Sequence, residues 1–241
     1  MTSVKGFVKG VPIIGDIVSR TYRFIRSQVA FAHDIAEQKA FPGSKMYWED
    51  RYVKGGNSGA GSYGRLATFK AEILNSFVEE NEIKSVLEFG CGDGNQLTLA
   101  RYPRYVGFDV SVTAIDLCMK KFERDRTKSF YLIDAYAGQI ADLALSLDVI
   151  FHLVENDVFE EYMRRLFRAA TRFVIIYSSN IDKNDAYQGS HVNHRKFTDW
   201  VERNCDGWFL KTHIPNKYPG DGNDTENSFA DFYIYERTFQ N

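Results

Sequence analysis

Residues 86–95, VLEFGCGDGN, join an apolar segment to three glycines at alternate positions. The apolar part predicts a buried strand, and Gly90, Gly92 and Gly94 let the chain turn sharply where a side chain would obstruct it. A helix that begins after such a turn presents free backbone N–H groups, so that a flat, polar cofactor can lie directly on the main chain. The segment therefore predicts a cofactor site at the end of a buried strand.

Strands and helices alternate over most of the chain. Apolar runs predict seven strands, at residues 85–90, 105–110, 129–135, 141–147, 172–179, 208–214 and 229–238. Helices are predicted at residues 65–80, 96–101, 113–125, 158–170 and 195–204. Since no helix separates the last two strands, we expect an antiparallel pair at one edge of the sheet. The chain is thus predicted to have an α/β fold: a doubly wound, mostly parallel, seven-stranded Rossmann-like sheet with an antiparallel edge strand and an N-terminal helical cap.

The part of the chain before this core divides into an arm and a cap. Its first 30 residues hold five basic side chains and one acidic one, and apolar residues recur at spacings of four and three from Val18 to Ala36. This pattern predicts an amphipathic helical arm over residues 1–45, which packs on its own chain, on a second copy, on a partner enzyme or on a membrane surface. Residues 46–83 are the predicted cap, whose glycine-rich loop is either a disordered linker or a lid over a ligand. Residues 84–241 form the predicted cofactor-binding core.

Composition and charge exclude several classes of partner. The net charge is −2 at pH 7, so we expect no nucleic-acid partner. The three cysteines lack metal-ligand spacing and indicate reduced thiols, and no stretch reaches the ~20 apolar residues that a membrane-spanning helix needs. We therefore expect a cytoplasmic protein without a transmembrane segment that acts on a small molecule. A second copy or a partner protein is expected to bind through residues 1–40.

The acidic residues around the glycines indicate which cofactor binds. The dinucleotide fingerprint GxGxxG also follows a first strand, but the spacing here is GxGxG. Glu88 lies two residues before the first glycine, and Asp109 ends the second predicted strand. A carboxylate at the end of that strand can accept hydrogen bonds from both hydroxyls of a ribose. A phosphate-binding P-loop is excluded because the chain has no GxxxxGK[ST] motif.

With these residues in view, the chain resembles the class I S-adenosylmethionine-dependent methyltransferases of the small-molecule or sugar type. Their first motif is similar to VLEFGCGDG, their second strand ends in an acid such as Asp109, and ADLALSLDVIFHL resembles their fourth strand with its short, histidine-bearing helix. YWEDRY with the glycine-rich loop is similar to the cap of such enzymes. The resemblance covers about residues 46–180 and extends through the last two strands. It implies a methyltransferase with S-adenosyl-L-methionine as cofactor.

The resemblance also implies roles for residues around the cofactor. Asp109 is expected to hold the ribose, and Glu88 and Asp93 to face the amino group and the sulfonium, although Asp93 is equally well explained as a turn former. Asp134 occupies the position from which a residue of the resembled methyltransferases contacts the adenine amino group, and helix capping is its alternative role. The aromatic residues of the cap are expected either to form a wall over the adenine or the acceptor, or to pack in the protein core. The predicted cofactor-binding residues are Tyr47, Trp48, Glu88, Gly90, Gly92, Gly94, Asp109 and Asp134.

The methyl acceptor is expected beyond the carboxyl ends of the strands. The predicted catalytic residues there are Asp148, His152, His191 and His194. His152 is the first choice for the general base because the ordinary pKa of histidine lies near neutral pH, with a structural hydrogen bond as the alternative role. His191 and His194 are interpreted as substrate-binding or helix-capping residues. A metal held by these two histidines and Asp148 is a weaker alternative, and we expect no metal.

Three further residues are predicted to bind the substrate. Arg195 suits a phosphate or a carboxylate in the acceptor, and Ser62 and Tyr63 are candidate contacts from the glycine-rich loop. The predicted reaction is O-methylation of a small polar acceptor, sugar-like or phosphorylated, such as a sugar or a glycan precursor. The alternatives are a nicotinamide-dependent oxidoreductase on a Rossmann fold and a non-catalytic, cofactor-binding partner subunit.

Overall fold

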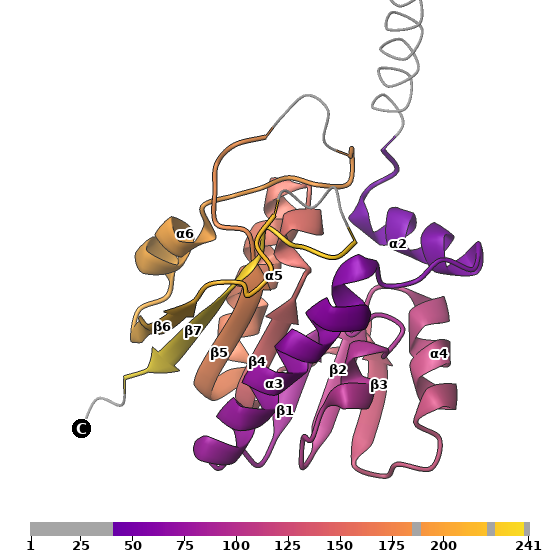
Figure 1. Cartoon of the computed structure of the whole chain (residues 1–241), viewed down its shortest axis with the longest axis horizontal. Coiled ribbons are helices and arrows are strands. Elements are labelled where there is room, and N and C mark those ends of the chain that lie inside the picture. Colours follow the sequence, from indigo (N-terminus) through magenta and orange to yellow (C-terminus); the bar gives the residue numbers. More distant parts are fainter. Residues whose placement is uncertain (1–40, 185–188, 221–224, 239–241) are drawn as a thin grey trace, which may run out of the picture. The chain divides into compact units, whose positions relative to one another are not determined.

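The computed structural model describes residues 41–184, 189–220 and 225–238. Its centre is a seven-stranded sheet with the strand order β3-β2-β1-β4-β5-β7-β6 (Figure 1). β7 runs antiparallel to both β5 and β6, and the remaining neighbours are parallel. The strands are β1 Val86–Phe89, β2 Tyr105–Asp109, β3 Lys128–Leu132, β4 Ala141–Leu147, β5 Ala170–Ser178, β6 Trp208–Ile214 and β7 Asp231–Arg237. This order confirms the predicted fold, with the antiparallel pair of β6 and β7 at one edge.

Helices cover both faces of the sheet (Figure 1). The described α-helices are α2 Ser44–Val53, α3 Gly64–Glu80, α4 Val112–Lys121, α5 Asn156–Arg168 and α6 Phe197–Asn204. One core cluster joins α3 and α4 to the sheet through residues such as Leu74 and Cys118. A second cluster joins α5 and α6 to the sheet through residues such as Met163 and Phe197. Two cores on opposite faces are what a doubly wound sheet requires, because each face must be buried against helices.

The register of the strands sets the position of the polar residues that follow them. Phe89 pairs with Phe108 in the parallel ladder of β1 and β2, so that Gly90 and Asp109 come next at the same edge. β4 lies on the other side of β1, with Leu145 opposite Glu88, and it ends just before Asp148. The carboxyl ends of three neighbouring strands therefore meet around the glycine-rich segment.

Two predicted elements differ from those observed. The third strand ends at Leu132 and continues as a single 3₁₀ turn, and the crossover to β4 contains no α-helix. Tyr136 in this crossover packs edge-on against Phe89, with ring centroids 5.2 Å apart. The helix predicted at residues 96–101 is only a 3₁₀ turn, Gln96–Leu99. Its backbone becomes extended at Ala100, shortly before a proline that disfavours continued helix.

α2 and α3 precede β1 and lie mostly within the segment that the sequence predicts as a cap. The apolar face of α3 is buried at Leu66, Phe69, Leu74 and Phe77. Most of the predicted arm lies outside the described residues, so the boundaries between arm, cap and core stay predictions. No helix in the described part of the chain has the length and apolar character needed to cross a membrane.

Candidate functional site

A cavity of about 610 Å³ lies at the carboxyl ends of β1, β2 and β4. Its volume is within the range of small-molecule and cofactor sites, roughly 300–1,000 Å³. The glycine-rich segment, the cap and the turn after β4 all contribute to its wall. The predicted site residues that line it are Trp48, Ser62, Glu88, Gly90, Gly92, Asp109, Asp148 and His152.

The glycine-rich segment needs its glycines because the backbone is left-handed and closely packed. Gly90 and Gly92 have φ angles of +83° and +56°. A Cβ atom on Gly90 would lie 2.5 Å from Cγ2 of Val149, and one on Gly92 would lie 2.3 Å from Oγ of Ser58. Both glycines therefore bring the main chain to the cavity wall, as the sequence predicts. Gly94 packs instead against α4, where a Cβ would lie 2.9 Å from Sγ of Cys118.

Asp109 is fixed at the end of β2 by two backbone hydrogen bonds. Gly92 N–H donates to Oδ2 at 2.8 Å, and Ser111 N–H donates to Oδ1 at 3.0 Å. Burial raises the pKa of Asp109, and the hydrogen bonds from Ser111 and Gly92 oppose that rise. Each carboxylate oxygen can accept a further hydrogen bond, so the side chain is oriented for a ligand with hydroxyl groups in the cavity.

Glu88 is buried on β1, where its protonation state depends on the charge of a ligand in the cavity. The hydroxyl of Tyr105 donates to Oε2 at 2.6 Å. Burial raises the pKa of Glu88 to about 7, with the nearby Lys70 acting in the opposite direction. A positively charged ligand beside Glu88 would favour its ionised form. This side chain therefore suits the ammonium or sulfonium of a cationic nucleoside.

A buried ion pair in the cavity wall was not anticipated from the sequence. Lys70 of α3 donates from Nζ to Oδ2 of Asp148 at 2.5 Å, and the Lys70 side chain is only 1% exposed. Asp148 adopts a left-handed backbone with φ of +59° just after β4. The sequence does contain a sign of this ion pair, because Lys70 lies on the apolar face of a helix, one turn from both Leu66 and Leu74. A lysine there needs a buried partner.

His152 is held in one tautomer by a backbone carbonyl. Its Nδ1 lies 3.0 Å from the carbonyl oxygen of His191. Because a carbonyl only accepts, Nδ1 carries the hydrogen and Nε2 keeps its lone pair. Burial lowers the pKa of His152 to about 3, so the ring is neutral around neutral pH. Trp48 packs edge-on against this ring at a centroid distance of 4.9 Å.

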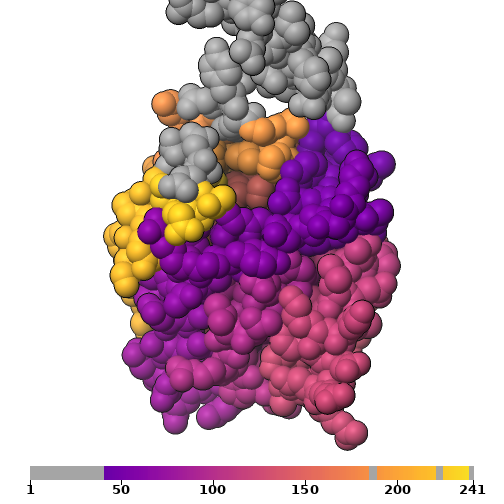
Figure 2. All heavy atoms as spheres, turned by 45° about the vertical axis from the view of Figure 1, so that its right-hand side comes forward, coloured from indigo at the N-terminus to yellow at the C-terminus, as the bar shows by residue number. Residues whose placement is uncertain are grey.

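His191 does not line the cavity, and its ring stacks on two other rings. The ring centroid of Tyr47 lies 4.5 Å from it and that of His152 lies 5.3 Å from it. Burial lowers the pKa of His191, with Arg51 adding to the effect. Figure 2 shows the surfaces of α2 (indigo) and of the segment after β5 (orange) near one another at one end of the molecule. Tyr47 thus joins the cap to the histidine-bearing segment, and it does not line the cavity.

Several other predicted residues are bound elsewhere by the protein itself. Asp134 pairs with Lys45 at 2.9 Å on the surface, and the Tyr63 hydroxyl donates to Asp93 at 2.7 Å. Nδ1 of His194 lies 2.6 Å from the hydroxyl of Ser179. None of these predicted residues is among the cavity-lining side chains of the described part of the chain. Roles for Asp134, Tyr63 and His194 in direct ligand contact therefore gain no support from the geometry.

Arg195 is also directed at the protein rather than at the cavity. Its guanidinium donates to the carbonyls of Leu153 and Val154 at 2.7 and 2.9 Å and to Oδ1 of Asn156 at 2.9 Å. These partners occupy the donors that an anionic substrate would need. The geometry does not support Arg195 as an anion-binding residue.

The metal alternative is likewise unsupported. Among residues 41–184, 189–220 and 225–238, no group of three or more histidine, cysteine, aspartate or glutamate side chains is placed to hold a metal ion. The two histidines of the segment after β5 face different partners, Tyr47 for one and Ser179 for the other.

The residues of the cavity fit S-adenosylmethionine. Two buried carboxylates, Glu88 and Asp109, complement a cation and a ribose, and the left-handed main chain at Gly90 and Gly92 forms the wall between them. The lining residues that sequence reasoning missed include Lys70 and Gln96. Oε1 of Gln96 is buried without a partner among the described residues, so an acceptor is left for a ligand's hydrogen-bond donor.

Comparison with known proteins supports the same assignment. Residues 63–221, more than half of the chain, match the family model described as a methyltransferase domain. No curated protein sequence matches the chain significantly. Among solved structures, magnesium protoporphyrin IX methyltransferase from Synechocystis PCC 6803 with bound SAH is similar, with 16% identity, a TM-score of 0.60 and coverage of 80% of this chain and 98% of that one.

Two other solved structures share the fold at low identity. The methyltransferase domain of bacterial CtHen1-C has 17% identity and a TM-score of 0.55, covering 70% of this chain and 97% of that one. The N-methyltransferase NodS from Bradyrhizobium japonicum WM9 has 13% identity and a TM-score of 0.55, covering 71% and 94%. Neither of the predicted alternatives, an oxidoreductase or a non-catalytic subunit, is supported by these matches. The chain belongs to the methyltransferase-domain family and is an S-adenosylmethionine-dependent class I methyltransferase.

Proposed function

We propose that the chain transfers a methyl group to a hydroxyl oxygen of a small, polar, sugar-like acceptor. The observation that carries this proposal is the 3.0 Å contact between Nδ1 of His152, a residue that lines the cavity, and the His191 carbonyl, from which we assign the neutral tautomer that keeps Nε2 as a proton acceptor. A hydroxyl must lose its proton as it is methylated, and the neutral imidazole of His152 is the proposed acceptor of that proton. Because burial lowers its pKa to about 3, the ring is a weaker base than the ordinary histidine for which it was chosen from the sequence.

The residues that would hold the cofactor are those of the glycine-rich edge. Asp109 would accept from the ribose hydroxyls, and Glu88 would face the cationic methionine part. Lys70 and Gln96 would contact the polar end of the same part, because both line the cavity. When bound, S-adenosylmethionine supplies an electrophilic methyl group on its sulfonium.

The acceptor side of the cavity would be formed by Trp48, Asp148 and His152. The flat indole of Trp48 suits the apolar face of a sugar ring, and the carboxylate of Asp148 suits its hydroxyls. His152 would hold the acceptor hydroxyl through Nε2 and take its proton as the new bond forms. The cap, by covering this side, would exclude water from the reacting oxygen.

A neutral sugar-like acceptor is favoured over a phosphorylated one. The residue expected to bind an anion, Arg195, has its donors engaged by Leu153, Val154 and Asn156. A glycan precursor is therefore proposed as the substrate class. A cytoplasmic location, and contact with a second copy or a partner through residues 1–40, belong to the same proposal.

The test is transfer of a labelled methyl group from S-adenosylmethionine to a panel of nucleotide sugars, free sugars, phosphorylated sugars and phenols. We expect labelled product with a sugar hydroxyl and a loss of about 100-fold in turnover for His152→Gln. Binding of S-adenosylhomocysteine, measured by calorimetry, should be unchanged in that variant. Turnover that survives His152→Gln would remove His152 as the base, and methylation confined to nitrogen acceptors would overturn the proposal.

A further inference from the structure

The guanidinium of Arg195 is bound to the segment that directly follows His152. It donates to the carbonyl oxygens of Leu153 and Val154 and to the side chain of Asn156, all within 2.9 Å. The same guanidinium lies over the ring of Phe159 at 4.6 Å. Three hydrogen bonds and a ring contact fix its position, since the planar fork of arginine matches several acceptors at once.

The segment that carries Arg195 also carries the carbonyl that orients His152. The His191 carbonyl accepts from Nδ1 of His152 at 3.0 Å. Between these two residues, Asn193 N–H donates to the carbonyl of Phe151 at 2.7 Å, and its side chain donates to the carbonyl of Val154 at 3.2 Å. Hydrogen bonds therefore join the two segments on both sides of His152.

We infer that Arg195 is a positioning residue that sets the tautomer of His152 through the carbonyl of His191. In a neutral imidazole either nitrogen can carry the hydrogen. Only the form with hydrogen on Nδ1 leaves Nε2 able to accept a proton from a substrate hydroxyl. If the carbonyl of His191 moves away, the imidazole loses the partner that selects this form.

This inference rests on the proposed function for its effect on catalysis, but its structural part can be tested without an acceptor. The measurement is ¹⁵N NMR of the histidine rings in the full chain at pH 7, with S-adenosylhomocysteine present. The chain has five histidines, so the His152 signals are assigned by their absence in His152→Gln. In the native chain we expect a single neutral form with hydrogen on Nδ1.

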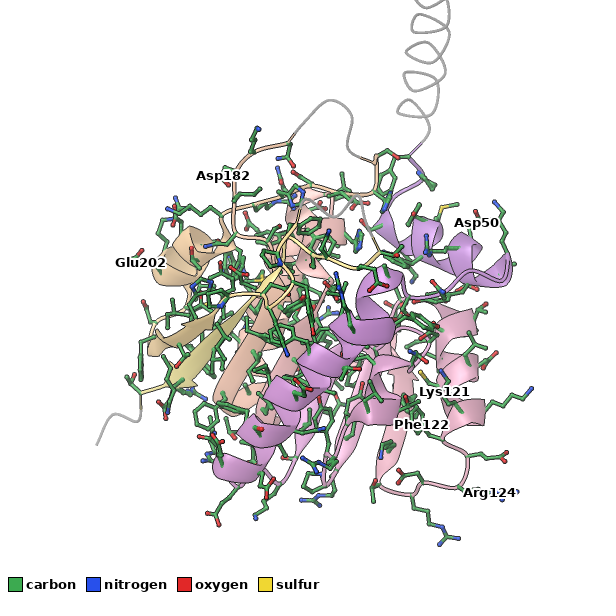
Figure 3. The ribbon with its side chains drawn as sticks, in the orientation of Figure 1. Asp50, Lys121, Phe122, Arg124, Asp182 and Glu202 are labelled. Carbon is green, nitrogen blue, oxygen red and sulfur yellow. The ribbon has the colours of Figure 1, made fainter. Side chains whose placement is uncertain are left out.

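The informative variant is Arg195→Ala, and the matched control is Arg124→Ala. Arg124 lies beyond the end of α4 with its side chain 94% exposed, and it points away from the body of the molecule (Figure 3). We expect Arg195→Ala to show both tautomers of His152 and Arg124→Ala to match the native chain. Should Arg195→Ala fail to fold, Arg195→Lys replaces it, because a single ammonium cannot reproduce the fork of hydrogen bonds.

A His152 spectrum that keeps only the Nδ1–H form in the folded Arg195 variant overturns the inference. Kinetics add a second readout once an acceptor is known. A positioning role predicts a fall in kcat of about tenfold with KM nearly unchanged. A rise in KM alone would assign Arg195 to substrate binding and overturn the inference. If no hydroxyl acceptor is methylated, the proposed function fails while the NMR result still decides the role of Arg195.

Discussion

The hydroxyl of Tyr63 donates to Oδ2 of Asp93 at 2.7 Å, and this contact ties the cap to the glycine-rich segment. Two hydrogen bonds between Ser58 and Asp93 reinforce it: Ser58 N–H donates to the same oxygen at 3.0 Å, and Asp93 N–H donates to Oγ of Ser58 at 2.9 Å. The glycine-rich loop, which the sequence predicts to be either a disordered linker or a lid, is therefore attached to the glycine-rich segment of residues 90–94 by hydrogen bonds within the protein.

Removing the Tyr63 hydroxyl tests this attachment. Tyr63→Phe deletes one hydrogen bond to a charged acceptor, so we expect a loss of about 1 kcal/mol in the free energy of unfolding. Faster proteolysis within residues 55–62 should accompany the loss. Urea unfolding and limited proteolysis measure the two effects. A variant with native stability and a native cleavage rate would show that the contact does not hold the loop.

The same contact should depend on pH. Burial of Asp93 acts to raise its pKa, but hydrogen bonds from Tyr63, Asn95 and Ser58 outweigh it and lower the pKa below its ordinary value. A carboxyl group with a depressed folded-state pKa adds stability above its unfolded pKa of about 3.9, and this stability is lost as the pH falls through the folded value. The stability difference between native chain and Tyr63→Phe should thus be larger at pH 7 than at pH 3.

The buried pair of Lys70 and Asp148 should be sensitive to loss of one partner. Lys70→Met leaves a carboxylate that is only 16% exposed without its ion-pair partner, so we expect a loss of about 3–5 kcal/mol in the free energy of unfolding. Lys54 and Asp50 form a matched surface pair at the same 2.5 Å, with Asp50 at the edge of the molecule (Figure 3). Lys54→Met should cost less than about 1 kcal/mol. Equal losses in the two variants would contradict the burial argument.

Much of the fold is predictable because its signals are local. The apolar run before Gly90 and the alternation of strands with helices predict the sheet, and the absence of a helix between the last two strands predicts the antiparallel pair. Glu88, Gly92 and Asp109 line the cavity because parallel strands end at a common edge, which is a property of the topology.

The predicted site residues that the protein itself binds away from the cavity depend on contacts between distant segments. Arg195 lies 42 positions from Leu153, and the partner of Asp134 is Lys45, 89 positions away. A polar side chain in a loop gives no local signal of whether its partner is a substrate or the protein's own backbone. Lys70 differs, since a charge in the apolar stripe of α3 is itself a local sign of a buried partner.

The glycine at position 90 should be irreplaceable for steric reasons. Gly90→Ala places a Cβ 2.5 Å from Val149 in a left-handed backbone, whereas a Cβ on Gly138, where φ is +93°, would have no atom within 4 Å. Both substitutions carry the left-handed penalty of about 1–2 kcal/mol. Only Gly90→Ala should additionally weaken S-adenosylhomocysteine binding, measured by calorimetry. Native affinity in Gly90→Ala would show that the main chain at position 90 can shift to make room for the Cβ without weakening binding.

The depressed pKa of His152 predicts how stability varies with acid. Burial lowers this pKa to about 3, while an unfolded histidine titrates near 6.5. Between these values the unfolded chain binds a proton that the folded chain does not, so stability falls as the pH drops below about 6.5, by at most about 1.4 kcal/mol per pH unit. His152→Gln should reduce this slope. An unchanged slope in His152→Gln would show that the ring titrates normally.

The proposed binding of the cofactor's ribose by Asp109 is tested most directly by calorimetric titration of S-adenosylhomocysteine into the native chain and into Asp109→Asn. The amide keeps the shape of the side chain but loses the charge and one acceptor oxygen. We predict one site per native chain and an affinity at least about tenfold weaker in the variant, or about 1.4 kcal/mol. Equal affinities would contradict the account, because the ribose would then be held elsewhere than at the end of β2.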